Sequence, residues 1–186
     1  MATAAQRRQY VGPALFSFGF RPFFLGAAIW AALAVLLWLP EYFGELQLPT
    51  AFGPLDWHIH EMLYGYVPAV MTGFLLTAIP NWTGRLPVQG SPLVWLAALW
   101  LAGRIAVMFS AKIGAVAAGV IDVAFLVGLC AFAAREIVAG KNWRNLRVLV
   151  LVVLLAIGNA IFHIEALKTG AADLGMRVGL VAAIGL

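Results

Sequence analysis

The sequence predicts an all-α fold, a polytopic bundle of transmembrane helices, and three observations carry this prediction. Of the 186 residues, 63% are hydrophobic and 11% are charged, whereas a soluble domain is close to half apolar and a quarter charged. The apolar residues gather in continuous runs close to the ~20 residues that a helix needs to cross a bilayer. These runs are rich in Ala and Leu and lack the period-two alternation of strands.

Five apolar segments are long enough to span a membrane, and a sixth is too short. The sixth begins near Val178 and reaches the last residue, Leu186, after too few residues to cross. We therefore expect a single transmembrane helical domain over residues 1–186 that forms the N-terminal half of a longer protein. The five full segments are Phe23–Leu39, Met62–Ile79, Pro92–Ser110, Ile113–Ala134 and Leu146–Phe162.

Prolines punctuate these segments. Pro40 is expected to end the first segment and Pro80 the second, because proline cannot donate a helical hydrogen bond. Pro92 is expected to open the third segment. Pro68 lies inside the second segment, where we expect it to kink the helix and free a backbone carbonyl.

Lysine and arginine in the short loops predict the orientation. They concentrate in alternate loops, and the positive-inside rule places such loops in the cytoplasm. The N-terminus is therefore expected inside, and the chain's three histidines, His58, His60 and His163, are all expected toward the outer face. The residues that carry this prediction are Arg7, Arg8, Arg21, Arg85, Arg135, Lys141, Arg144 and Arg147.

Composition and motifs exclude several functions. The formal net charge is +4, but the basic residues form short clusters between apolar runs, so we expect no nucleic-acid partner. Cys130 is the only cysteine, which rules out an internal disulfide. The sequence contains no phosphate-binding glycine loop and no Ser-His-Asp arrangement, so it identifies no catalytic residue.

The segment His58-Ile59-His60-Glu61-Met62 is a candidate metal or haem site. In a regular helix, His58 and His60 would point to different neighbours, whereas in an extended segment both could bind one ion. Glu61 could orient an imidazole, and Met62 adds a soft ligand suited to copper or haem iron. The alternative is an interfacial cluster of amphipathic residues, with Trp57 in the aromatic belt.

His163 lies at the end of the fifth segment, one turn after Asn159. An asparagine within an apolar run needs a hydrogen-bond partner. Asn159 could therefore orient His163 or bond across to another helix. His163 itself is either a ligand or an interfacial histidine.

Two charged residues, Arg104 and Asp122, fall inside apolar segments. Ionisable groups at such positions are rare and usually paired. At ~1.5 Å per residue, Arg104 lies about 12 Å and Asp122 about 14 Å from the outer edge of the hydrocarbon core. The matching depths predict an Arg104–Asp122 ion pair that clamps two helices. The alternative is that Arg104 binds a haem propionate or another anion.

Four blocks of this sequence resemble the NnrS family, in order and across nearly the whole chain. The tryptophan-histidine and asparagine-tryptophan blocks are specific. The blocks are Phe20-Arg21-Pro22-Phe23-Phe24-Leu25-Gly26, Trp57-His58-Ile59-His60-Glu61-Met62-Leu63-Tyr64-Gly65, Gly73-Phe74-Leu75-Leu76-Thr77-Ala78-Ile79-Pro80-Asn81-Trp82-Thr83-Gly84-Arg85 and Gly158-Asn159-Ala160-Ile161-Phe162-His163.

This resemblance implies a multi-pass protein of the bacterial inner membrane that contains haem and copper and acts in the nitric oxide response or denitrification. Matching motifs carry His58, His60 and His163, which become the candidate cofactor ligands. Glu61 and Asn159 would orient them. The implied partners are membrane lipid, nitric oxide or nitrosyl species, and the remaining helices of the full-length protein.

Two other functions remain open. Pro68 and the intramembrane charges also suit a transporter or permease, whose substrate path runs through broken helices. The third alternative is a structural membrane subunit of a redox complex without a cofactor of its own. Neither the residues nor the resemblance decides whether the protein catalyses a reaction.

Overall fold

The computed structural model describes residues 10–186 and, within that range, contains helices but no strands, as the sequence predicts. Arg7 and Arg8, which contribute to the predicted orientation, lie outside the described residues. The elements are η1 (Ala14–Phe16), α2 (Phe20–Tyr42), α3 (Pro54–His60), η2 (Glu61–Tyr66), α4 (Val67–Thr83), α5 (Ser91–Met108), α6 (Ser110–Ile113), α7 (Ala115–Ala139), η3 (Trp143–Asn145), α8 (Leu146–Thr169) and α9 (Asp173–Gly185).

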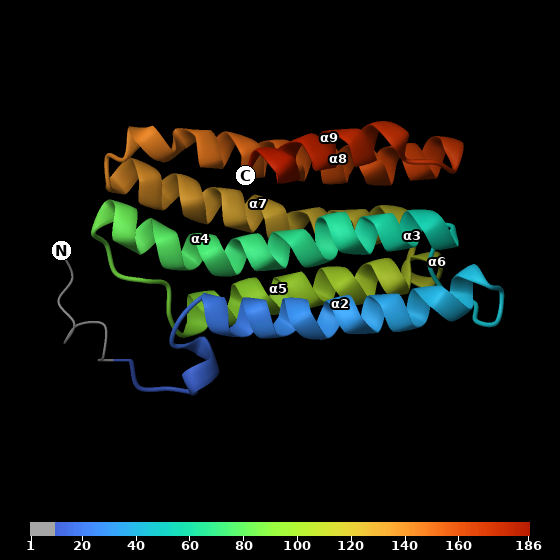
Figure 1. Ribbon diagram of the computed structural model, residues 1–186, viewed down its shortest axis with the longest axis horizontal. Helices are drawn as coiled ribbons and strands as arrows, with labels where there is room; N and C mark the ends of the chain where they lie inside the picture. Colours follow the sequence, from blue (N-terminus) through green and yellow to red (C-terminus); the bar gives the residue numbers. More distant parts are fainter. Residues whose placement is uncertain (1–9) are drawn as a thin grey trace.

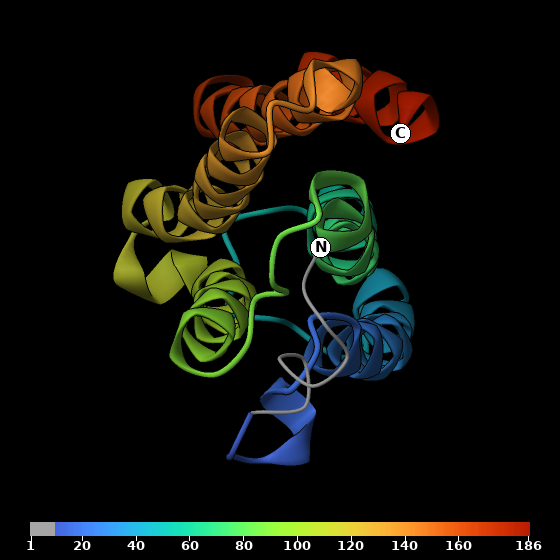
Figure 2. The same cartoon turned by 90° about the vertical axis from the view of Figure 1, so that its left-hand side faces the viewer.

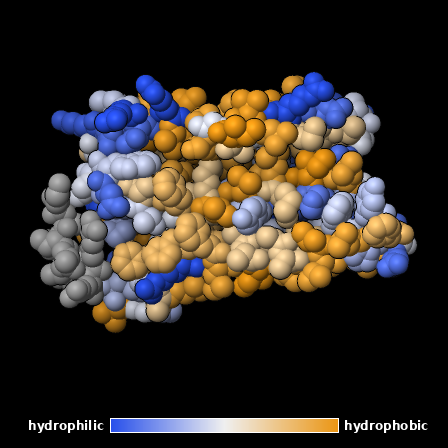
Figure 3. Space-filling view, in the orientation of Figure 1, coloured by the Kyte–Doolittle hydropathy of each residue, from blue (hydrophilic) through white to orange (hydrophobic). Residues whose placement is uncertain are grey.

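The long helices lie roughly parallel or antiparallel in an elongated bundle (Figures 1 and 2). Helix α2 packs against α4, α5 against α7, α7 against α8, and α8 against α9. Within residues 10–186, five helical segments are long and apolar enough to cross a membrane. Hydrophobic side chains cover most of the face in Figure 3, and hydrophilic ones gather toward both ends. The molecule is therefore a multi-pass membrane protein.

The continuous segment α3–η2–α4 forms the centre of the bundle. In its apolar 18-residue stretch 67% of the residues are buried, whereas the corresponding stretches of the other four spans are 22–39% buried. Its residues contact α2, α5, α7 and α9. Three polar side chains on this segment, His60, Glu61 and Thr72, are therefore fully enclosed by neighbouring helices, which is where a membrane protein can hold polar groups.

A π-helical stretch, η2, interrupts this central segment. The Val67 N–H bonds the Met62 carbonyl, five residues back, instead of the usual four. Pro68 follows directly and has no N–H to offer the Tyr64 carbonyl, so the backbone around Pro68 departs from regular α-helix. Such wide turns are frequent at functional sites, and here the wide turn carries Glu61.

Two predicted helix ends are wrong. Pro40 and Pro80 do not end their segments, because α2 continues to Tyr42 and α4 to Thr83. Each proline lies in the last turn, where the loss of one backbone hydrogen bond is tolerated. Helix α4 ends instead at Gly84, whose φ of 70° is left-handed and whose N–H bonds the Pro80 carbonyl.

Two further boundaries extend beyond the apolar runs. The fifth segment, predicted to end at Phe162, continues as α8 to Thr169, and the sixth helix begins at Asp173 rather than near Val178. Hydropathy marks only the part of a helix that lies in hydrocarbon, and these helices extend into the polar interface. As a result His163 lies about 10 Å inside its helix end rather than at it.

Candidate metal centre

Seven polar or amphipathic side chains from five segments meet inside the bundle and form one hydrogen-bonded network, the polar cluster. Each member is at most 7% exposed to solvent. The network joins parts of the chain that lie more than 130 residues apart, so only the folded bundle assembles it. Its members are Trp30 of α2, His60 of α3, Glu61 of η2, Arg104 of α5, Asp122 of α7, and Asn159 and His163 of α8.

Arg104 lies between two carboxylates. Its Nη1 donates to Glu61 Oε2 at 2.7 Å, and its Nη2 pairs with Asp122 Oδ1. Trp30 Nε1 donates to the same Glu61 oxygen at 2.7 Å. The ion pair between Arg104 and Asp122 that the sequence predicts is therefore present. Glu61 is a second partner that the sequence did not reveal. Arg104 has no exposed surface, and two of its nitrogens are bound by these carboxylates, so a propionate could reach it only by displacing its neighbours.

His60 connects the two acidic residues. Its Nδ1 lies 3.1 Å from Glu61 Oε1, and its Nε2 lies 3.2 Å from Asp122 Oδ2 and 3.0 Å from Asn159 Oδ1. Glu61 thus contacts His60 as the sequence suggests. Asn159 bonds across helices to His60 and Asp122 instead of orienting His163.

His163 completes the cluster at the same Asp122 oxygen that His60 faces. Its Nε2 lies 3.1 Å from Asp122 Oδ2, the oxygen that also receives the Asn159 amide at 2.8 Å. The rings of His60 and His163 are 5.0 Å apart between centroids. Imidazoles from the second and fifth spans therefore meet at one place.

This arrangement has the composition of a metal site. One ligand atom each from His60, Asp122 and His163 can be chosen so that all three lie within 4.8 Å of one another. Both imidazole nitrogens lie 3.1–3.2 Å from Asp122 Oδ2. Ligands at ~2.0–2.2 Å from a common ion are roughly 3 Å apart, so the spacing matches what an ion requires.

The charges of the cluster also favour a cation. Glu61 and Asp122 carry two negative charges and Arg104 one positive charge, all buried. With neutral imidazoles the formal charge is −1, and a buried uncompensated charge is costly. A proton on His60, whose two nitrogens both face oxygen acceptors, or a bound metal ion supplies the missing positive charge.

His58 and Met62 lie outside the polar cluster. The His58 ring stacks on Trp38 with centroids 3.9 Å apart, and its Nδ1 is buried without a hydrogen-bond partner in the described residues. Met62 packs half-buried against the apolar core. Because the segment is helical, His58 and His60 point to different neighbours. The structure thus forms the helical alternative rather than the extended one.

Three glycines make room for the cluster. A Cβ at Gly65 would collide with Arg104 Nη1. A Cβ at Gly103 would lie 2.8 Å from Asp122 Oδ1. A Cβ at Gly119 would lie 3.1 Å from His163 Cγ. The contacts at Gly65 and Gly103 are closer than a real Cβ makes, and the contact at Gly119 would require His163 to shift slightly. These glycines therefore allow the charged side chains to approach neighbouring helices.

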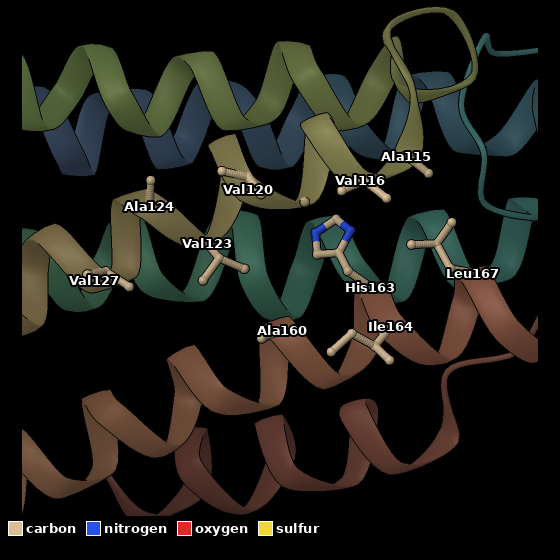
Figure 4. A pocket seen from close by; sticks show the side chains of 11 residues that line it. Ala115, Val116, Val120, Val123, Ala124, Val127, Ala160, His163, Ile164 and Leu167 are labelled. Carbon is tan, nitrogen blue, oxygen red and sulfur yellow. The ribbon is translucent and has the colours of Figure 1, made fainter.

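A groove of ≈ 540 Å³ runs between α7 and α8 beside the cluster (Figure 4). His163 is the one polar side chain in its lining, and its ring points across to α7. Small and branched residues line the remainder, among them Val120, Val123 and Ala160. The groove brings an apolar surface up to one of the three possible metal ligands.

The fold and the cluster together define a multi-pass helical membrane protein with a buried, charged histidine–carboxylate centre. The profile described as NnrS protein matches residues 14–186, and the chain therefore belongs to the NnrS family. Comparison with curated proteins and with solved structures found no match.

Proposed function

We propose that this protein binds a copper ion through His60, Asp122 and His163 and acts in the nitric oxide response at the bacterial inner membrane. The observation that carries the proposal is the meeting of two imidazole nitrogens and one carboxylate oxygen in a buried cluster whose formal charge is −1 when the imidazoles are neutral. Family membership and the five apolar spans support the membrane role.

The donor set fits copper. Imidazole nitrogen and carboxylate oxygen suit Cu(II) and other divalent transition ions. The partners of the ligands are also in place, because Arg104 occupies Asp122 Oδ1 and leaves Oδ2 facing both histidines. Glu61 accepts from His60 Nδ1 and so directs Nε2 toward Asp122. Such supporting contacts orient ligands and strengthen metal binding.

The residues would exchange a proton for the metal ion. His60 Nε2 faces oxygens of Asp122 and Asn159, and any proton that it carries there would have to leave before it could become a ligand. A copper ion bound here would supply a redox-active Lewis acid with an open coordination position for nitric oxide.

Haem fits the described residues less well. The groove beside His163 could receive an apolar macrocycle, but none of its lining residues, all within the described range, is a cation that could pair with the propionates. Arg104, the other candidate, is bound by Glu61 and Asp122. We therefore assign copper, and not haem, to this cluster.

Metal analysis of the purified protein tests the proposal. After exposure to copper and removal of loosely bound ions, wild type should retain about one copper per chain. His163→Gln should lose most of it, while His58→Gln, the matched control, should retain it. Equal copper in the two variants would contradict the assignment.

The optical spectrum separates the remaining alternatives. If the wild-type protein binds no copper and shows a Soret band that His163→Gln loses, the cofactor at this histidine would be haem instead of copper. A colourless, metal-free protein would favour the permease, whose substrate path would use the buried charges, or the cofactor-free subunit. Fixed co-purifying partners would then point to the subunit.

A further inference from the structure

A second polar feature lies at the opposite end of the bundle from α6. This end carries the start of α2, the α4–α5 connection and the α7–α8 connection (Figure 1). Among the described residues it holds one acidic residue, Glu136, which is bound by Arg85 at 2.5 Å and approached by Arg135 at 4.0 Å. The basic residues at this end are Arg21, Arg85, Arg135, Lys141, Arg144 and Arg147.

Arg144 and Arg147 are two neighbouring uncompensated cations at this end. Both are exposed, and neither forms an ion pair with a carboxylate within residues 10–186. They are three residues apart, across the junction of η3 and α8, so their side chains emerge on neighbouring positions of one face. Two guanidinium groups so placed form a binding position for a phosphate group.

The surface around them changes from charged to apolar along α8. A hollow of ≈ 520 Å³ is lined by Trp143, Arg144, Leu146, Arg147, Val150 and Leu151. Val150 and Leu151 follow Arg147 by three and four residues, on the same face and deeper in the membrane. Trp143 is 60% and Val150 57% exposed, so no described residue covers this face, and the Trp143 indole lies at the helix end, where tryptophan favours the interface.

We propose that this hollow binds an anionic phospholipid. Arg144 and Arg147 would hold the phosphate, Trp143 would lie at the glycerol level, and Val150 with Leu151 would contact the start of an acyl chain. Neither arginine has a carboxylate partner, so their two positive charges attract a headgroup with a net negative charge more strongly than a zwitterionic one. The apolar continuation selects a lipid over a free phosphate ion.

Native mass spectrometry of the detergent-solubilised protein, titrated with phosphatidylglycerol or phosphatidylcholine, tests the proposal. Phosphatidylglycerol should bind wild type more tightly than phosphatidylcholine. The double variant R144Q/R147Q should weaken phosphatidylglycerol binding roughly thirtyfold, the effect of two basic residues near an anionic surface. R144K/R147K should retain most of the affinity, because it keeps both charges.

Two controls test whether the lipid itself binds, and whether it binds in this hollow. K112Q/K168Q removes two exposed cations from the other end of the bundle and should leave phosphatidylglycerol binding unchanged. Inorganic phosphate should not displace the lipid at millimolar concentration. Unchanged binding in R144Q/R147Q, an equal loss in K112Q/K168Q, or displacement by phosphate alone would overturn the proposal.

Discussion

Asp122 is the residue on which the polar cluster depends most. One carboxylate oxygen pairs with Arg104, and the other faces His60, Asn159 and His163. All of these partners are buried, so none can turn to water if the charge of Asp122 is lost. Loss of this charge would leave Arg104 with Glu61 alone and would remove the acceptor that two imidazoles and the Asn159 amide share, and disrupting such a buried network is costly.

Asp122→Asn should therefore destabilise the protein strongly. Loss of one partner of a buried pair costs about 3–5 kcal/mol, so we expect a clearly lower melting temperature and folded yield in detergent. Asp173→Asn, which changes an exposed aspartate at the start of α9, is the matched control and should leave both unchanged. Equal melting temperatures for wild type and Asp122→Asn would show that the ion pair does not hold the helices together.

Part of this cluster follows from sequence and part does not. The depths of Arg104 and Asp122 along two antiparallel spans are sufficient to predict their ion pair. The positions of His60 and His163 at segment ends predict that both lie toward the same face of the membrane. The contact of Arg104 with Glu61 could not be found, because the predicted segment began at Met62 and left Glu61 outside the helix. The sequence gives one indication of the role of Trp30, because its indole N–H lies inside an apolar run and needs a hydrogen-bond acceptor there.

At the scale of helices, glycines decide how closely charged side chains approach their neighbours. Gly103 of α5 faces Asp122 of α7, and a Cβ there would lie 3.2 Å from the Asp122 Cα as well as close to its carboxylate. Gly128, also on α7, would place a Cβ 3.6 Å from Leu96, an ordinary contact. The same helix pair thus offers one crowded and one roomy glycine.

Gly103→Ala should destabilise the bundle, and Gly128→Ala should not. The first forces overpacking beside a buried carboxylate, which typically costs about 1–3 kcal/mol. The second gains up to ~1 kcal/mol of helix propensity without a clash. Thermal unfolding of both variants checks the prediction, and a Gly103→Ala protein as stable as Gly128→Ala would show that α5 and α7 are not packed as described.

The spans themselves are predictable, but their ends and the π-helical turn are not. Continuous hydropathy identifies all five spans because lipid must cover them. Hydropathy does not predict that α8 continues past Phe162 or that the second span begins at Pro54. Polar residues at the interface extend these helices without raising their hydropathy. The π-helical turn depends on packing around Glu61 as well as on Pro68, and only Pro68 is visible in the sequence.

At the scale of the whole molecule, the polar cluster lies nearer one bundle end than the other. His60, Asp122 and His163 are each about 10 Å from the helix ends near α6. The predicted orientation puts this end outside and the arginine-rich end in the cytoplasm. The cluster would then be closer to the outer face.

Labelling of single cysteines tests this orientation. In a Cys130→Ser background, Lys112→Cys and Ser91→Cys place exposed thiols at opposite ends of the bundle. A membrane-impermeant maleimide added to intact cells should label Lys112→Cys, and it should label Ser91→Cys only after permeabilisation. The reverse pattern would invert the topology and place the cluster toward the cytoplasm.

The central claim is that His60, Asp122 and His163 share one metal ion. Electron paramagnetic resonance of the copper-loaded protein tests it most directly, because each coordinated imidazole nitrogen splits the Cu(II) signal. In the copper that each protein retains, wild type and His58→Gln should show two such nitrogens, and the small remainder in His60→Gln and His163→Gln should show one. A nitrogen count that is the same in all four proteins, or that falls only in His58→Gln, would contradict the shared site.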